Sequence, residues 1–151
     1  MYLQLAKSEE EHNFLFESRT HPEVDKKLSG TAPQSYEKHI EYINRVQEKT
    51  RYIYVAYAEN FMVGYSQIYD ITENHVEVGF VIHPNYQGKG YGKEIVLKTI
   101  EKAKEQFTEK KIILYVLINN PKAIHIYEKL GFEKKGTKDD TFYMELNQSL
   151  K

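Results

Sequence analysis

A glycine-rich segment, Gln87-Gly88-Lys89-Gly90-Tyr91-Gly92, lies between a run typical of a β-strand and a run with helical periodicity. Successive backbone N–H groups at such a turn, beside the positive end of a helix dipole, form a site for phosphate groups. Glycines suit this role because a Cβ would block the approach of an anion and the positive φ angles that turn several N–H groups inward. Such turns also occur for packing alone, so the loop by itself leaves both interpretations open.

Two common nucleotide-binding motifs do not fit this segment. The dinucleotide fingerprint Gly-x-Gly-x-x-Gly, started at Gly88, would require a glycine where Lys93 stands. The phosphate-binding motif Gly-x-x-x-x-Gly-Lys-Ser/Thr does not occur anywhere in the chain. The sequence therefore argues against a nicotinamide-dependent or ATP-dependent enzyme.

Local patterns predict the elements that position this loop. Ser8 and Glu11 fit a capping box before a first helix that runs to about Arg19, and His21-Pro22 indicates a loop after it. The nearly continuous apolar run at 111–118 indicates a strand covered on both faces by helices. The other predicted elements are strands at 2–6, 51–58, 61–69, 75–82, 132–133 and 141–146, and helices at 36–46, from 92 to about 107, and from 121 to about 131.

Size and charge limit the classes of function. The 151 residues (17.9 kDa) predict a single domain spanning 1–151. The balance of 21 Lys and Arg against 22 Asp and Glu gives a net charge of -1, which argues against nucleic acid or an anionic membrane as the main partner. The absence of Cys excludes thiol catalysis. No secretion signal or apolar run of about 20 residues is present, so we expect a cytoplasmic protein.

The loop and a downstream segment resemble one family. Gln87-Gly88-Lys89-Gly90-Tyr91-Gly92 matches the Gln/Arg-x-x-Gly-x-Gly/Ala signature of the GNAT superfamily of N-acetyltransferases, and Gly79–Pro84 is similar to the strand that leads into that signature. Residues 120–132, with Asn120, Ala123 and Tyr127-Glu128-Lys129-Leu130-Gly131-Phe132, resemble a second family segment. The resemblance covers roughly the second half of the chain. It implies a mixed α/β (α+β) fold with a mostly antiparallel sheet of about six to seven strands, about four flanking helices, and a splayed parallel pair that binds the cofactor.

The resemblance also implies acetyl-CoA as cosubstrate. No pair of histidines has metal-ligand spacing with a nearby carboxylate, so we expect no metal. The loop N–H groups would hold the pyrophosphate of acetyl-CoA, and the exposed strand backbone before the loop would pair with the pantetheine amides. The implied cofactor-binding residues are Phe80, Val81, Ile82, Gln87, Gly88, Lys89, Gly90, Tyr91, Gly92, Lys93, Asn120, Ala123 and Tyr127. Tyr127 would also donate a proton to the departing CoA thiolate. Spacing alone favours Asn120 as an N-cap and Tyr127 as a core aromatic residue, and the resemblance reverses this preference for Tyr127.

Glu77 is the candidate general base. An alkylamine with a pKa near ~10.4 is almost wholly protonated at neutral pH, so a group must accept its proton before the nitrogen can attack. Glu77 precedes the loop on the strand at 75–82 and would act directly or through a water molecule. Some GNAT members carry a Glu at this position and others do not. The alternative is a solvated carboxylate on a strand.

The acceptor is the least determined feature. Arg19-Thr20-His21-Pro22-Glu23-Val24, followed by Glu37-Lys38-His39, is similar to the opening of bacterial GNAT enzymes that acetylate nucleotide-linked amino sugars, although the Trp that those often have is absent. We expect direct attack by a primary amine of a small molecule, with Arg19, His21 and His39 near its entrance. Acetylation of a protein N-terminus, polyamine or drug amine remains open, as does a non-catalytic acyl-CoA-binding module. The protein is expected to be a monomer or homodimer.

Overall fold

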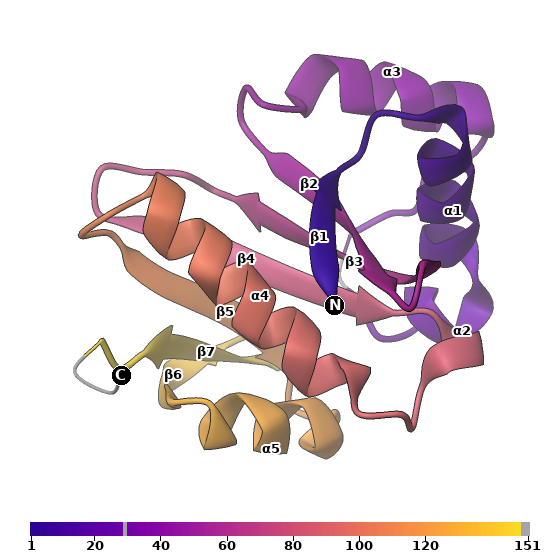
Figure 1. Cartoon of the computed structure of the whole chain (residues 1–151). Helices are drawn as coiled ribbons and strands as arrows, with labels where there is room; N and C mark the ends of the chain where they lie inside the picture. Colours follow the sequence, from indigo (N-terminus) through magenta and orange to yellow (C-terminus); the bar gives the residue numbers. More distant parts are fainter. Residues whose placement is uncertain (29, 149–151) are drawn as a thin grey trace.

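The computed structural model describes residues 1–28 and 30–148 (Figure 1). One seven-stranded sheet has the order β1-β2-β3-β4-β5-β7-β6, and all its pairs are antiparallel except β4 with β5. The elements are β1 (Tyr2–Leu5), α1 (Glu9–Thr20), α2 (Pro22–Asp25), α3 (Tyr36–Val46), β2 (Tyr52–Ala58), β3 (Phe61–Tyr69), β4 (His75–Ile82), a 3-10 turn η1 (Pro84–Tyr86), α4 (Tyr91–Gln106), β5 (Lys111–Leu117), α5 (Pro121–Lys129), β6 (Phe132–Lys138) and β7 (Thr141–Leu146). This confirms the predicted fold class, with five α-helices among the described residues rather than about four.

The first helix begins at the predicted capping box. The backbone N–H of Glu11 donates to Ser8 Oγ, and the Ser8 N–H donates to Glu11 Oε1, both at 3.1 Å. The prediction of a loop at His21-Pro22 is wrong, because Pro22 is the first residue of the short helix α2 and His21 caps it. Proline is tolerated there since the first turn of a helix needs no backbone N–H bond.

The sheet carries a hydrophobic core on each face. On one face, Leu15 of α1 and Ile43 of α3 pack with Val81, and we call this side the α1–α3 face. On the other, Ile95 of α4 packs with Val76, and we call it the α4–α5 face. Figure 1 shows α4 running across β4 and β5, with α1 and α3 on the opposite side of the sheet. Because side chains alternate along a strand, neighbouring residues of β4 point to different faces.

Two predictions for the C-terminal strands need correction. Strand β6 extends to Lys138 instead of ending near 133, because its polar residues pair with β7 at the sheet edge, where exposed side chains are tolerated. Strand β5 is not covered by helices on both faces, since Tyr115 is 38% exposed and its ring contacts Tyr143 and Lys138 of the neighbouring C-terminal strands, with 5.3 Å between the two tyrosine ring centres. The apolar run at 111–118 therefore predicted a strand correctly, but it did not predict which elements pack against each face of that strand.

Within the described residues, no helix is long and apolar enough to cross a membrane.

Candidate active site

The glycine-rich loop joins β4 to α4 through the turn η1. Gly88 and Gly90 have φ angles of 78° and 84°, in the left-handed region that glycine adopts without strain. Gly90 is the N-cap of α4, and no side chain caps the helix. The first N–H groups of a 16-residue helix are therefore available to an anion at its positive end.

The glycines of this loop serve different purposes. A Cβ added to Gly88 or Gly90 would meet no atom within 4 Å, so the space above both residues is open. A Cβ on Gly92 would lie 3.4 Å from Cδ1 of Ile126, at the edge of ordinary van der Waals contact, so this glycine lies where α5 packs on α4. The open backbone at Gly88 and Gly90 fits a phosphate group, whereas Gly92 fits the packing explanation.

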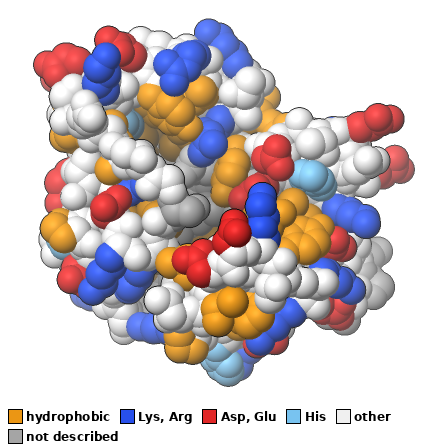
Figure 2. Space-filling view, turned by 180° about the vertical axis from the view of Figure 1, so that it is seen from behind, with side chains coloured by type: hydrophobic (Ala, Val, Ile, Leu, Met, Phe, Trp, Pro, Cys, Tyr) orange, Lys and Arg blue, Asp and Glu red, His pale blue; other side chains and the backbone are white. Residues whose placement is uncertain are grey.

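Strands β4 and β5 diverge beside the loop. They pair only at His75–Glu77 with Lys111–Ile113, although β4 continues to Ile82. A cavity of about 770 Å³ opens at this gap and is lined by every residue from Glu77 to Ile82. Consecutive strand residues point to opposite faces, so the cavity connects the α1–α3 face with the α4–α5 face. Figure 2 shows a hollow in the centre of one side of the molecule, with charged side chains of both signs around it.

The α5 side of the cavity is formed by one helix face. Asn120 caps α5, accepting a bond from the Ala123 N–H at 3.4 Å, and Asn120, Ala123 and Tyr127 all line the cavity. The Tyr127 ring lies between Phe80 and Phe132, with centroid distances of 5.7 and 6.0 Å. Burial raises the pKa of Tyr127 to about 12. Its hydroxyl has no hydrogen-bond partner among the described residues and can donate to a ligand.

Glu77 lies on the opposite side of the gap. The Tyr69 hydroxyl donates to Glu77 Oε2 at 2.5 Å, and the Arg51 guanidinium lies 4.3 Å from the centre of the Tyr69 ring. Burial is the largest cause of the raised pKa of Glu77, which the Tyr69 hydrogen bond partly offsets. A half-buried carboxylate with a raised pKa is a better proton acceptor than a solvated one.

Sequence reasoning missed Tyr69 and Arg51. The sequence could have predicted the contact between Tyr69 and Glu77, because Tyr69 ends one strand of an antiparallel pair with β4. The register of that pair sets Tyr69 directly opposite Glu77. Arg51 comes just before β2, and no local pattern distinguishes it from a solvated arginine at a strand end.

Most of the predicted site residues share the cavity. Its lining includes Arg19, His39, Glu77, Phe80, Val81, Ile82, Gln87, Gly88, Tyr91, Gly92, Asn120, Ala123 and Tyr127. Four predicted residues are not in that lining: His21, Lys89, Gly90 and Lys93. His21 instead caps α2, accepting from the Glu23 N–H, and its ring lies 5.6 Å from that of His83.

His39 lies in the cavity wall but does not supply a positive charge. It is only 6% exposed, among the rings of His12, Phe16 and Tyr36. Burial and the neighbouring His12 lower the pKa of His39 to about 4, so the ring is neutral at pH 7.

In the described part of the chain, no group of three or more His, Cys, Asp and Glu side chains is arranged to hold a metal ion.

A mostly antiparallel sheet with one diverging parallel pair beside a glycine-rich helix start is the architecture of an acyl-CoA N-acetyltransferase. The chain belongs to the acetyltransferase (GNAT) family, whose sequence pattern it matches over residues 12–132. The spermidine N(1)-acetyltransferase of Vibrio cholerae is 29% identical over 72% of this chain and 61% of its own length. The acetyltransferase PseH of Campylobacter jejuni is 23% identical over 93% of this chain and 88% of its own.

The fold is also that of a solved structure. The crystal structure of spermidine N-acetyltransferase from Vibrio cholerae in complex with CoA and spermine superposes with a TM-score of 0.87. The two chains are 21% identical, and the match covers 97% of this chain and 95% of that one. This likeness confirms the fold, and it leaves the acceptor of this protein to be argued from its own cavity.

Proposed function

We propose that this protein transfers the acetyl group of acetyl-CoA to a primary amine of a small molecule. The observation that carries the proposal is the gap between β4 and β5, which joins Glu77 on one face of the sheet to Tyr127 and the glycine-rich loop on the other. The uncapped start of α4 and the open space above Gly88 and Gly90 fit a pyrophosphate. The β4 backbone beyond Glu77 has no strand partner on the β5 side and fits the amides of a pantetheine arm.

The roles of the two titratable side chains follow from their surroundings. Acetyl-CoA, when bound, supplies a thioester carbonyl to the gap between the strands. Glu77 accepts a proton from the substrate ammonium group, directly or through water, and the neutral amine then attacks the thioester carbonyl carbon to form the N–C bond. As the C–S bond breaks, Tyr127 donates to the sulfur. Since the Tyr127 pKa is about 12 and that of an ordinary thiol is about 8.5, hydrogen-bond donation to the thiolate is more favourable than complete proton transfer.

Our preferred acceptor is a nucleotide-linked amino sugar. Two of the predicted substrate residues, Arg19 and His39, line the cavity. The cavity volume of about 770 Å³ lies within the range of small-molecule sites. The relatives named above favour a second acceptor class, a polyamine, because the Vibrio cholerae protein is a spermidine acetyltransferase. A cytoplasmic location and a monomeric or homodimeric state stay predictions of the sequence.

A free-thiol assay across a panel of amines tests the proposal. The panel contains a nucleotide-linked amino sugar, spermidine, a drug amine and a peptide with a free N-terminus, each at millimolar concentration with acetyl-CoA. Thiol release with the amino sugar, and little with the others, supports the preferred acceptor, whereas a strong preference for spermidine or the peptide overturns it. Acetyl-CoA binding without thiol release for any amine would favour a non-catalytic acyl-CoA-binding module.

A further inference from the structure

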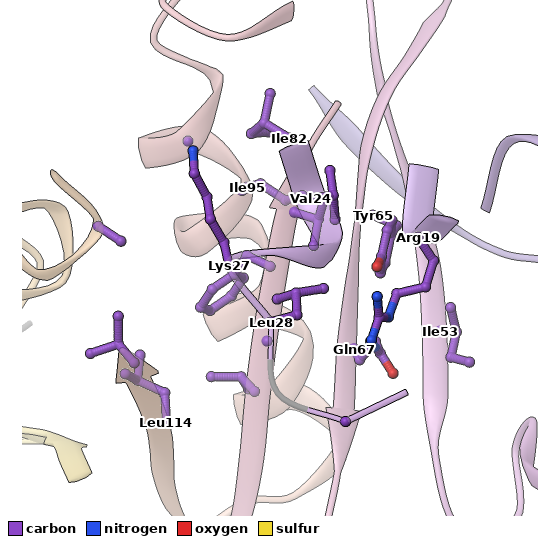
Figure 3. Close-up of a pocket in the computed structure, with 18 of the residues that line it drawn as sticks. Arg19, Val24, Lys27, Leu28, Ile53, Tyr65, Gln67, Ile82, Ile95 and Leu114 are labelled. Atoms are coloured by element: carbon purple, nitrogen blue, oxygen red, sulfur yellow. The ribbon is translucent and has the colours of Figure 1, made fainter. Parts of the chain in front are cut away.

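A buried hydroxyl without a partner lies in the cavity wall on the α1–α3 face. Tyr65 of β3 lines the cavity and is only 4% exposed, yet its hydroxyl makes no hydrogen bond with any described residue. A buried polar group left unsatisfied costs roughly 1–3 kcal/mol, so such groups in a cavity wall often meet a ligand. Figure 3 shows Tyr65 beside Arg19 and Gln67 on one wall of the cavity.

Two arginines of the same cavity wall act electrostatically on this hydroxyl. Arg19 of α1 is held by Asp25, with 2.6 Å between Nη1 and Oδ1, and its side chain is 17% exposed. Arg51 donates through Nη1 to Oε1 of Gln67. Both arginines act on Tyr65 by lowering its pKa, against the larger effect of burial, which raises it. A guanidinium carries five N–H donors, so one bond to a protein oxygen leaves each arginine able to bind an anion as well.

The charges around this part of the cavity favour an anion. On the α1–α3 side, four cationic side chains line the cavity with two carboxylates: Arg19, Lys27, Lys38 and Arg51 with Glu23 and Glu77. Glu23 pairs with Lys26 at 2.8 Å, and Arg19 and Lys38 are themselves paired, with Asp25 at 2.6 Å and Glu41 at 3.5 Å. With these partners counted, five cationic side chains stand against four carboxylates, a small positive excess that rests on Lys27 and Arg51. A polycation would meet repulsion here, whereas a carboxylate or phosphate would be attracted.

The strand register sets the distance from this wall to Glu77. Tyr69, Gln67 and Tyr65 of β3 lie opposite Glu77, Gly79 and Val81 of β4, and they share one face because side chains alternate. Each step of two residues along a strand covers roughly 7 Å, so Gln67 and Tyr65 lie about 7 and 13 Å along the sheet from the position of Glu77. An anion bound there would be several bonds away from an amine at Glu77.

We propose that Arg19, Arg51, Tyr65 and Gln67 form a subsite for an anionic group on the acceptor, separated from its amine by several bonds. The inference rests on the proposed function and narrows its acceptor class. A carboxylate and a phosphate share the required chemistry, which is a compact group of negatively charged oxygens. The α-amine of an amino acid does not fit, because its carboxylate is only one carbon away.

Matched pairs of linear amines test the subsite. The pairs are 6-aminohexanoate with 6-aminohexanamide, and 6-aminohexyl phosphate with 6-aminohexan-1-ol, so that each pair differs only in the anionic group. Calorimetry on the CoA-bound protein measures binding, and the free-thiol assay measures kcat and KM. We expect the anionic member of at least one pair to bind about tenfold or more tightly than its neutral partner, and the pair that shows this identifies the anion.

Variants connect this preference to the named residues. Tyr65→Phe removes only the unpartnered oxygen and should reduce the ratio of anionic to neutral binding severalfold, as should Arg19→Gln. Tyr54→Phe is the matched control, since Tyr54 is equally buried on the α4–α5 face and its hydroxyl accepts from Gln106. Its ratio should equal that of the wild type.

The outcomes separate the subsite from the proposed function. Equal binding within both pairs, no binding of any of the four compounds, or a Tyr65→Phe ratio equal to that of the control overturns the subsite. Thiol release from neutral amines with no anion preference would leave the acetyltransferase activity intact while removing the subsite. Selective binding of the anionic compounds without thiol release from any amine would support the subsite and contradict the proposed function.

Discussion

The buried His39 should make the stability of this protein depend on pH, and His39→Phe should remove much of that dependence. The pKa of His39 is about 4 in the folded protein and 6.5 in the unfolded chain. Between these values the unfolded chain binds a proton that the folded protein does not, so the free energy of unfolding falls as the pH is lowered. The full pKa difference lowers the free energy of unfolding by roughly 3.4 kcal/mol below pH 4. About 1.3 kcal/mol of this decrease occurs between pH 7.5 and pH 5.5.

Urea unfolding at pH 7.5 and 5.5 measures this effect. Over that interval the free energy of unfolding of the wild type should fall by about 1 kcal/mol more than that of His39→Phe. In thermal unfolding, this corresponds to a difference of roughly 2–4 °C in the change of Tm. Phenylalanine suits the site because the rings of Phe16 and Tyr36 already surround it. The control is His125→Phe, on an exposed position of α5, which should retain the wild-type dependence. Equal pH dependence in His39→Phe and the wild type would refute the assignment of a depressed His39 pKa.

Three further predictions concern the candidate active site. Gly90→Glu should abolish the stabilisation by acetyl-CoA, about 2.7 kcal/mol at a hundredfold excess over Kd, because it places bulk and negative charge at the α4 start. Gly136→Glu, on β6, is the control in a thermal-shift assay. Tyr127→Phe should lower kcat roughly 10–10³-fold with little change in acetyl-CoA affinity, and unchanged kcat would contradict its role as donor. Tyr69→Phe removes a hydrogen bond that lowers the Glu77 pKa, so the acidic limb of the pH profile of kcat/KM should move to higher pH. Glu77→Gln should lower kcat. If the acidic limb of Tyr69→Phe moves to lower pH or stays fixed, Glu77 is not the group that titrates there.

The predictions that depended on local patterns agree closely with the structure. The capping box at Ser8 and Glu11, the strand at 75–82 and the N-cap at Asn120 all lie where the sequence placed them. Each is determined by residues within a few positions, through the backbone hydrogen bonds that one turn or one strand needs. The family signature around Gly88 and Gly90 is equally local, because the loop backbone requires glycine at those two φ angles.

Patterns failed where the partner of a segment decides its structure. The polar residues that continue β6 to Lys138 look like a loop in the sequence, but the β7 backbone satisfies their hydrogen bonds at the sheet edge. Tyr115 of β5 belongs to an apolar run yet remains 38% exposed, with its ring beside Tyr143 and Lys138. A local sequence does not carry information about which element will pack against it.

The sequence by itself determined the family and the loop, because local motifs specify them, and through the family resemblance it also suggested Tyr127 and Glu77 as candidates for catalysis. Only the tertiary structure decided the surroundings of those residues. The β3–β4 register sets Tyr69 against Glu77, and the approach of Arg19 and Arg51 to Tyr65 joins segments more than ten residues apart in the chain. Burial makes the ring of His39, which lines the cavity, neutral at pH 7. Proton affinity depends on desolvation and on neighbouring charges, and both are set by packing between elements that are distant in the sequence.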